Sequence, residues 1–291
     1  MPTTTATAEP ANRSTAEGVG PGSLIWERGG DWRALLVGGR SLLLQVAHPV
    51  VAAGVSEHSD FAADPWGRLM GTLELYVGGV IFGWPDGPAA AGARLREMHK
   101  SIKGVDAAGR RYHALQPDAY AWVHATLVEG FVALEDQFGR PFRPAELARL
   151  YDEMREVGRL YGLRDRDMAP DWPSFQAYFE EMVRIELEDN ATVREVLHAL
   201  THTPPPPELP IPEIFWSGIR PAAGHVGEIT TVGLLPVPLR ERLGLRWTRN
   251  QERELRALAA LVRRSTPLLP ERARLLPWAY NAKRRARRAA A

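Results

Sequence analysis

The stretch YAWVHATLV (residues 120–128) belongs to a long helical pattern, and this pattern predicts a helical fold for the 291-residue chain. The same stretch places a histidine among the apolar residues of that helix. Within residues 118–138, Tyr120, His124 and Leu127 recur at helical spacing, so the imidazole points where the apolar side chains point. A buried imidazole either satisfies both nitrogens by hydrogen bonds in the core or binds a metal. The pattern alone leaves both interpretations open.

Helical periodicity dominates the rest of the chain, and the alternation typical of strands is nearly absent. The apolar spacing from Trp32 to Ala47 predicts one helix, which the following His-Pro pair breaks or kinks. Asp64 as N-cap and Pro65 at the first helical position predict the start of another helix. Its glycines favour close approach of a helix or a flat ligand. Further helices are expected at about 89–103, 118–138, 143–161, 173–187, 190–202 and 248–264.

Proline-rich TPPPPELPIP (203–212) resembles a linker between domains, but the residues after it argue against a second domain. They contain only scattered apolar runs, such as EIFWSGI and VGLLPVPL, which look too discontinuous for a core of their own. We therefore expect an all-α chain with a single globular helical domain at residues 23–280. A disordered tail is expected at 1–22, and a basic tail at 281–291 that is either a solvated helix end or a contact for an acidic surface or membrane.

Composition excludes several classes of function. With 36 basic and 35 acidic residues and no zinc-finger or RNA-binding pattern, nucleic acid is not an expected partner. The absence of cysteine excludes disulfides, thiolate metal sites and a Cys nucleophile, and leaves His, Tyr and carboxylates as iron ligands. The longest apolar tract, residues 42–55, falls short of the roughly 18–20 residues of a membrane span. We expect a protein without a transmembrane segment or signal peptide, located in the cytoplasm.

Four further side chains are candidates for a site. Arg68 and Thr72 lie four residues apart on one helix face, where a guanidinium and a hydroxyl can meet an anion or a polar oxygen species. The alternative is an exposed arginine beside a threonine that bonds to its own helix. His99 and His48 repeat the ambiguity of His124, since each is either a ligand or an ordinary packed histidine.

Three segments in order resemble the domain family shared by bacterial latex-clearing rubber oxygenases and the fungal oxygenase MpaB. The resemblance covers roughly residues 24–250. It implies a helical fold that encloses an apolar pocket for haem b. The segments are GGRSLLLQVAHPVVAAGVSEHSDFAADPWGRLMGT, REMHKSIKGVDAAGRRYHALQPDAYAWVHATLV and LPVPLRERLGLRWT.

Site roles are implied by this resemblance residue by residue. His124 matches the proximal ligand of the haem iron, and Arg68 and Thr72 match the Arg and Thr of the oxygen-side helix. The chain departs from the rubber enzymes at two positions: Gly71 stands where they have a Lys, and Val128 where they have an Arg. The resemblance thus implies that the protein binds haem, but it does not imply that the protein cleaves rubber.

The resemblance implies a haem-dependent oxygenase that acts with O2 on an apolar small molecule, with isoprenoids among the candidates. Two alternatives stay open. One is a non-haem metal oxidase that uses His48, His99 and His124 as ligands. The other is a helical binding protein of the same fold that has lost catalysis. The many alanines and arginines are typical of a bacterial source with GC-rich DNA.

Overall fold

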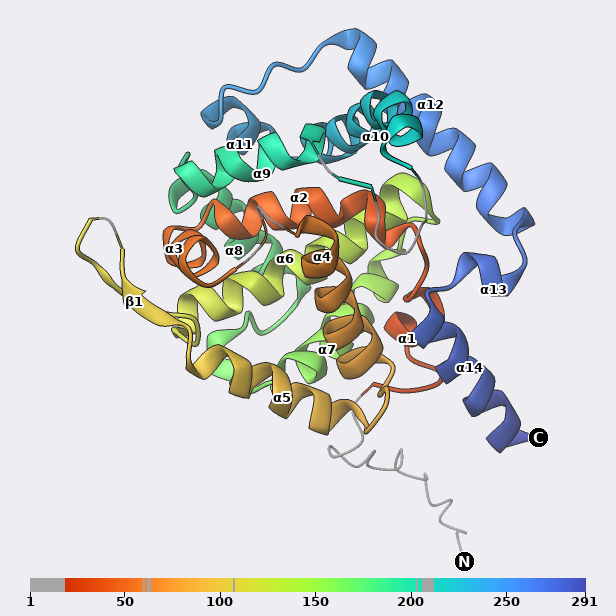
Figure 1. The fold of residues 1–291 in the computed structure, drawn as a ribbon. Coiled ribbons are helices and arrows are strands. Elements are labelled where there is room, and N and C mark those ends of the chain that lie inside the picture. The colour runs from red at the N-terminus through yellow and green to blue at the C-terminus, as the bar shows by residue number, and fades with distance from the viewer. Residues whose placement is uncertain (1–18, 60, 62–63, 107, 203, 206–211) are drawn as a thin grey trace, which may run out of the picture.

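The computed structural model describes residues 19–291 apart from positions 60, 62–63, 107, 203 and 206–211 (Figure 1). Most of these residues are helical, and the strands within them form one short hairpin. The expected all-α fold is confirmed. The expected disordered tail falls largely outside the described residues, as does most of the proline-rich stretch after position 202.

The helices and strands are spread along the whole of the described chain. The first half contains α1 (Leu24–Arg28), α2 (Ala34–Val46), α3 (Pro49–His58), α4 (Pro65–Thr72), the π-helix η1 (Leu73–Ile81), α5 (Pro88–Lys100), β1 (Lys103–Val105), β2 (Arg111–His113) and α6 (Pro117–Phe138). The second half contains α7 (Pro144–Leu160), η2 (Asp165–Asp167), α8 (Trp172–Ile185), α9 (Ala191–His202), α10 (Glu213–Gly233), α11 (Val237–Arg242), α12 (Arg249–Ser265), η3 (Thr266–Leu268), α13 (Glu271–Arg274) and α14 (Pro277–Ala290).

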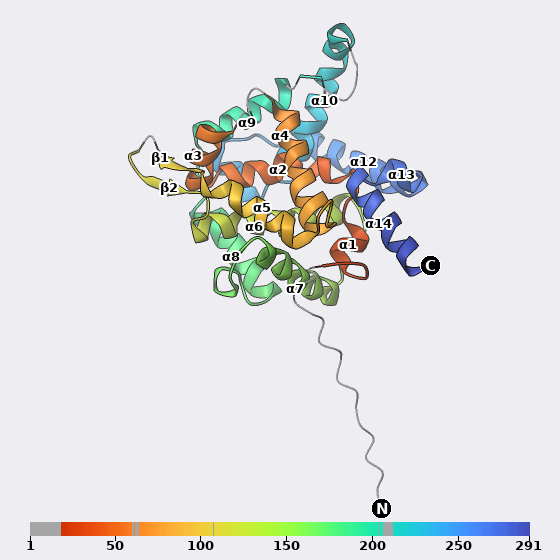
Figure 2. The ribbon, with the colours of Figure 1, turned by 60° about the horizontal axis from the view of Figure 1, so that its bottom comes forward.

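Helices α2 and α6 cross the middle of the molecule side by side (Figure 1, Figure 2). Helix α10 lies against α2 and α9, and α4 passes over the front of α2 and α6 in Figure 1. Most of the residues of α6 are buried, which explains why its apolar positions extend all around the helix rather than along one stripe. The histidine of YAWVHATLV therefore belongs to the central helix of the fold.

Helix α2 ends where the sequence predicts, because Pro49 restricts the preceding residue to an extended backbone. The last carbonyls of a helix have no partner within it, and side chains from elsewhere supply the missing donors here. Trp122 Nε1 donates to the Leu44 carbonyl at 2.8 Å, and Asn190 Nδ2 donates to the Val46 carbonyl at 2.8 Å. These bonds tie α6 and the start of α9 to the end of α2.

No single helix in the described part of the chain is long and apolar enough to cross a membrane. Among the described residues, only α2 and α3 taken together reach the length and composition of a span, and the chain bends by 107° between them.

The helix expected to begin at Asp64 is two elements rather than one. Asp64 does cap it, accepting from the Gly67 amide at 2.8 Å. From Leu73 onward the chain continues as the π-helix η1, which apolar periodicity does not predict.

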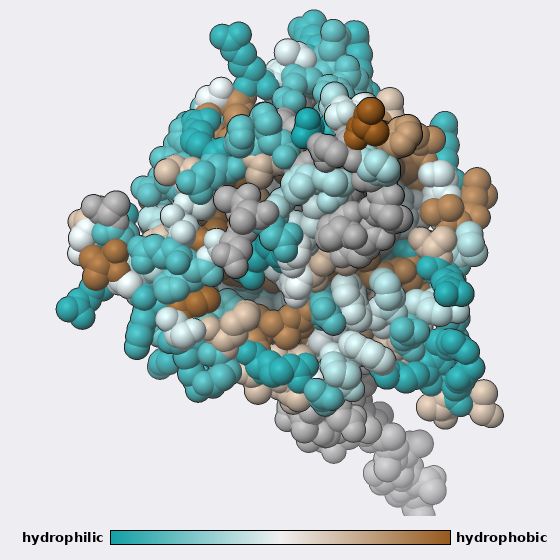
Figure 3. Space-filling model, in the orientation of Figure 1, coloured by the Kyte–Doolittle hydropathy of each residue, from teal (hydrophilic) through white to brown (hydrophobic). Residues whose placement is uncertain are grey.

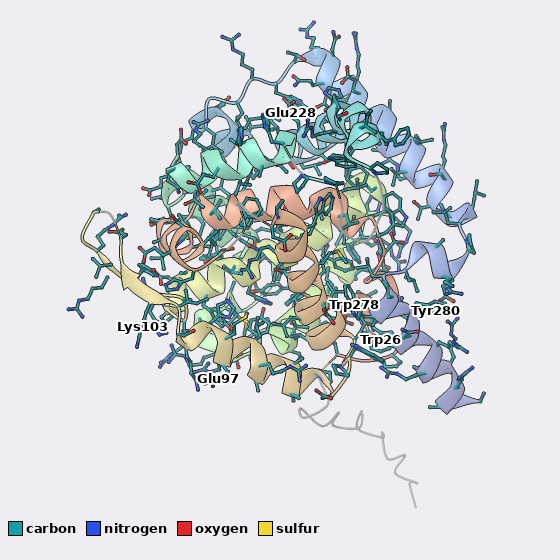
Figure 4. All side chains as sticks on the ribbon, viewed as in Figure 1. Trp26, Glu97, Lys103, Glu228, Trp278 and Tyr280 are labelled. Atoms are coloured by element: carbon teal, nitrogen blue, oxygen red, sulfur yellow. The ribbon has the colours of Figure 1, made fainter. Side chains whose placement is uncertain are left out.

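A Cβ at Gly78 would lie 2.9 Å from the ring of Trp278, and one at Gly79 would lie 2.8 Å from a side chain of α5. Figure 4 shows Trp278 where α14 meets this part of the chain. The glycines thus permit the close helix packing that the sequence predicts.

The chain after residue 212 contains more helix than the sequence suggests. Helix α10 runs for 21 residues through a region that the sequence was expected to fill with scattered apolar runs. The sequence does not predict this helix because Pro221 and several glycines interrupt its apolar periodicity. Apolar residues of α10, α12 and α14 join the same core as α6. The helices on both sides of the proline-rich stretch therefore share one core, as a single helical domain requires. Residues 281–290 of the expected basic tail are part of α14, where Ala282 is buried.

Replacement of Trp122 by Phe should lower the free energy of unfolding by about 2–3 kcal/mol, because it leaves a void and an unpaired Leu44 carbonyl. Trp122 is fully buried and stacks on Phe179. Trp247→Phe is the matched control, since it removes an indole hydrogen bond from a partly buried site. Urea unfolding measures both losses, and equal losses would show that Trp122 has no special part in joining α2 to α6.

Candidate functional site

A cavity of about 690 Å³ lies beside the central helix α6. Its walls come from α2, α4, η1, α5, α6 and α10, so segments from most of the chain meet around it. Aliphatic and aromatic side chains form most of the lining, with a few polar groups among them. This size and character are typical of sites for small molecules and cofactors.

The structure brings four of the five candidate residues to this cavity. Arg68 and Thr72 reach it from α4, His99 from α5 and His124 from α6. His48 is not among the lining residues; it is buried at the N-terminus of α3, where its Nδ1 has no hydrogen-bond partner among the described residues. In the described part of the chain, no three His, Asp or Glu side chains gather in the manner of a metal site.

His124 is almost completely buried at the edge of the cavity, with 4% of its surface exposed. Its Nδ1 is hydrogen-bonded to the Tyr161 hydroxyl, and its Nε2 has no hydrogen-bond partner in the part of the chain that the structure describes. Burial lowers the pKa of His124 to about 4, although a nearby Met154 carbonyl raises it slightly. The imidazole is therefore neutral at pH 7, the form in which histidine binds metals.

Glycine 158 of α7 leaves room for this ring. A Cβ at Gly158 would lie 3.3 Å from His124 Nε2 and 2.8 Å from Met168 Sδ, so a larger residue would press on both side chains. Nε2 thus lies on the α7 side of the imidazole, close to Gly158.

Tyr161 is a site residue that the sequence does not reveal. It stands just after α7 and reaches His124 only through tertiary packing, so no spacing within a motif marks it. Its ring meets those of Tyr76 and Tyr120 edge to face, with centroids 6.2 Å and 5.7 Å apart. Tyr120 Oη donates to the Tyr161 carbonyl at 3.2 Å, which holds this residue in place.

The bond between Tyr161 and His124 decides which imidazole nitrogen carries the proton. If Nδ1–H donates to the phenolic oxygen, Nε2 keeps its lone pair for a ligand. If the hydroxyl donates to Nδ1 instead, Nε2 carries the proton and needs an acceptor. Nε2 has no hydrogen-bond partner among the described residues in either arrangement: the first leaves a lone pair there for a metal, and the second leaves an unpaired N–H in the core.

His99 is the second imidazole of the cavity and is half-buried on α5. Its Nδ1–H donates to the Leu95 carbonyl at 2.7 Å, which places the lone pair on Nε2. Burial lowers the pKa of His99, the hydrogen bond to Leu95 raises it, and the positive charge of Arg68 lowers it further. His99 and Arg68 are therefore near neighbours, and the pair keeps this part of the cavity free of a second positive charge.

Arg68 and Thr72 of α4 differ in their hydrogen bonds within the protein. Arg68 has neither an ion pair nor a side-chain hydrogen bond with any residue in the described ranges, so its charge is available to a ligand. Thr72 Oγ1 donates to the Arg68 carbonyl at 2.9 Å, which is the bond within its own helix that the sequence leaves as an alternative. Between them, Gly71 lines the cavity, and a Cβ there would have no neighbour within 4 Å among the described residues.

Val128 lies one turn after His124 and is fully buried in the core. It does not line the cavity, so the position where the rubber enzymes have an Arg serves packing here.

Comparison with known proteins identifies the family. Residues 26–264 match the family described as ER-bound oxygenase mpaB/B'/Rubber oxygenase, catalytic domain. Neither the curated proteins nor the solved structures gave a match. The matched range includes all of the residues that line the cavity except Ile25. The chain therefore belongs to the MpaB and rubber oxygenase catalytic-domain family, a family of oxygenases.

Proposed function

We propose that this protein is a haem-dependent oxygenase that uses O2 to oxidise an apolar small molecule, with His124 as the axial ligand of haem b. One observation carries the proposal: a neutral, buried imidazole lines a large apolar cavity and has one nitrogen without a hydrogen-bond partner among the described residues. An unpaired polar atom in the core is unfavourable unless a ligand satisfies it. In a chain of this oxygenase family, an iron porphyrin meets that requirement.

The residues of the cavity fit such a group in three respects. A neutral imidazole is an iron ligand, and Tyr161 engages the other ring nitrogen as residues behind metal-bound histidines commonly do. The apolar walls suit the faces of a porphyrin. The space over Gly71 leaves room beside α4 for a flat ligand or a substrate.

When bound, haem b would supply the oxygen chemistry, and the chain would supply binding, orientation and charge. His124 would hold the iron, with Tyr161 keeping its ring in the required tautomer. Arg68 would place a fixed positive charge where negative charge develops as O2 is reduced. The apolar lining would receive the substrate and exclude water. Thr72, whose hydroxyl already bonds to its own helix, would have a lesser part.

Gly71 favours a substrate other than rubber. The resemblance places a Lys here in the rubber enzymes, whereas this chain has open space facing the cavity. We propose that this space admits an apolar substrate close to the oxygen-side helix. The geometry disfavours the non-haem alternative, because His48 does not share the cavity with His99 and His124.

His124→Ala should abolish haem retention or weaken it sharply, because a methyl group replaces the nitrogen that binds iron. The Soret band and a pyridine haemochrome assay of the purified variant measure this. His99→Ala and His48→Ala are the controls, and both should keep their haem. Full retention in His124→Ala would reject this ligand, and loss in His99→Ala alone would transfer the role to His99.

Tyr161→Phe should retain haem but lower its affinity by about 10- to 100-fold, the usual effect of removing the partner of a metal-bound histidine. Haem transfer to apomyoglobin measures the affinity, and the iron–histidine stretching frequency should shift as the imidazole loses its partner. Tyr151→Phe is the matched control, because it also removes a hydroxyl from the core, one that donates to the Ala169 carbonyl rather than to His124. Unchanged affinity and frequency in Tyr161→Phe would show that the tyrosine only fills space.

Arg68→Ala should keep the haem but slow oxygen consumption by roughly 10²–10³-fold, the effect of losing a comparable electrostatic group in other enzymes. Thr72→Val should have a smaller effect, because its hydroxyl is already bonded within the helix. Single-turnover oxygen consumption with apolar isoprenoids as trial substrates measures both. A wild-type rate in Arg68→Ala would remove this residue from the mechanism, and loss of haem would assign it to cofactor binding instead.

A further inference from the structure

Positive charge is concentrated in the last three α-helices. Residues 249–291 contain twelve Lys and Arg and three acidic residues, a net charge of +9, whereas the whole chain carries +1. Residues 1–248 therefore carry a net charge of −8. Helices α12, α13 and α14 lie along one side of the molecule (Figure 1), so the asymmetry in sequence becomes an asymmetry in space. A charge separation of this kind orients a protein toward an anionic partner.

Three leucines are exposed on this same side. Helix α12 buries Leu255 and Val262 against the core, and Leu261 stands on its opposite face with 65% of its surface exposed. Leu268 and Leu269 lie in and just after η3 and are 84% and 39% exposed. Hydrophobic residues come to the surface at the end of α12, at the right edge of Figure 3. Single exposed leucines are ordinary, whereas exposed apolar residues that gather on one side of a protein are typical of interaction sites.

Several arginines of these three helices have no partner for their charge among the described residues. Arg264 lies one turn after Leu261 on α12, and Arg272 lies on α13, which contacts α14. Other cations of α14 are engaged within the protein: Arg287 pairs with Glu271 at 2.8 Å, and Arg285 stacks over the ring of Trp84. The exposed arginines of these helices that have no ion pair or side-chain hydrogen bond with any residue that the structure describes include Arg264, Arg272, Arg284 and Arg288.

We propose that this face of α12, η3, α13 and α14 docks on an anionic lipid bilayer, with the leucines entering the acyl boundary and the arginines contacting headgroups. Guanidinium groups complement anionic headgroups, and exposed leucines gain from leaving water, so the combination favours lipid over other anionic partners. A nucleic acid would be recognised by basic and stacking groups, and leucines would add nothing. The inference goes beyond the oxygenase function and does not depend on it.

Sedimentation of the full-length protein with vesicles tests this docking surface. We expect binding to vesicles of phosphatidylcholine with about 30% phosphatidylglycerol, little binding to pure phosphatidylcholine, and weaker binding as salt is raised. The triple variant Arg264→Gln, Arg272→Gln, Arg284→Gln should bind about a hundredfold more weakly, since each guanidinium near an anionic surface contributes about fivefold. The triple variant Leu261→Ser, Leu268→Ser, Leu269→Ser should lose about tenfold.

Two matched triple variants separate this face from the general surface. Arg111→Gln, Arg166→Gln, Arg246→Gln removes the same charge elsewhere, and Val105→Ser, Ile185→Ser, Val237→Ser removes exposed apolar residues elsewhere. Both should bind vesicles like the wild type. Equal losses in the control triples, or no binding to anionic vesicles, would overturn the proposal. Tighter binding to a DNA duplex than to vesicles, unaffected by the leucine changes, would overturn it in favour of nucleic acid.

The binding assay does not require haem, so its outcome is distinct from that of the oxygenase proposal. Circular dichroism melting of each variant checks that the fold is intact. Since all of the substituted side chains are exposed, we expect melting temperatures within a few degrees of the wild type.

Discussion

The buried imidazole of His124 is the constraint on which the site depends. A neutral ring in the core needs partners for both nitrogens, and the described residues provide one, the Tyr161 hydroxyl. Gly158 of α7 makes room for the ring beside the other nitrogen, and burial lowers the pKa of His124 to about 4, so that the ring is neutral at pH 7. The central helix thereby serves both the core and the cavity, because most of its faces are buried and one of them borders open space.

Local chemistry made several features of the fold predictable. Asp64 and Pro65 mark a helix start, Pro49 marks the end of α2, and the spacing around His124 marks a buried helix. These depend on interactions within one or two turns, which a sequence shows directly. Helix α10 was hidden because Pro221 and its glycines weaken the periodic pattern, while packing on α2 and α9 compensates for the low helix propensity.

The candidate site was predictable only where a motif carried it. Arg68, Thr72, His99 and His124 could be named from spacing and family resemblance, and the structure places all four at one cavity. His48 could not be separated from them, because nothing in its local sequence says that its side chain lies outside the cavity. Tyr161 could not be found at all, since its role arises where the end of α7 meets α6. The π-helix η1 was missed for a related reason, because its apolar residues suit an α-helix equally well.

Haem binding is the proposal on which the assigned roles of His124, Tyr161 and Arg68 rest, and the absorption spectrum of the purified wild-type protein decides it. A pyridine haemochrome assay on the same sample identifies the porphyrin and counts it. We predict a Soret band and close to one haem b per chain, either as purified or after addition of haemin to the apoprotein. A folded protein that shows no Soret band as purified and does not shift the haemin spectrum on titration would mean that this cavity does not hold haem.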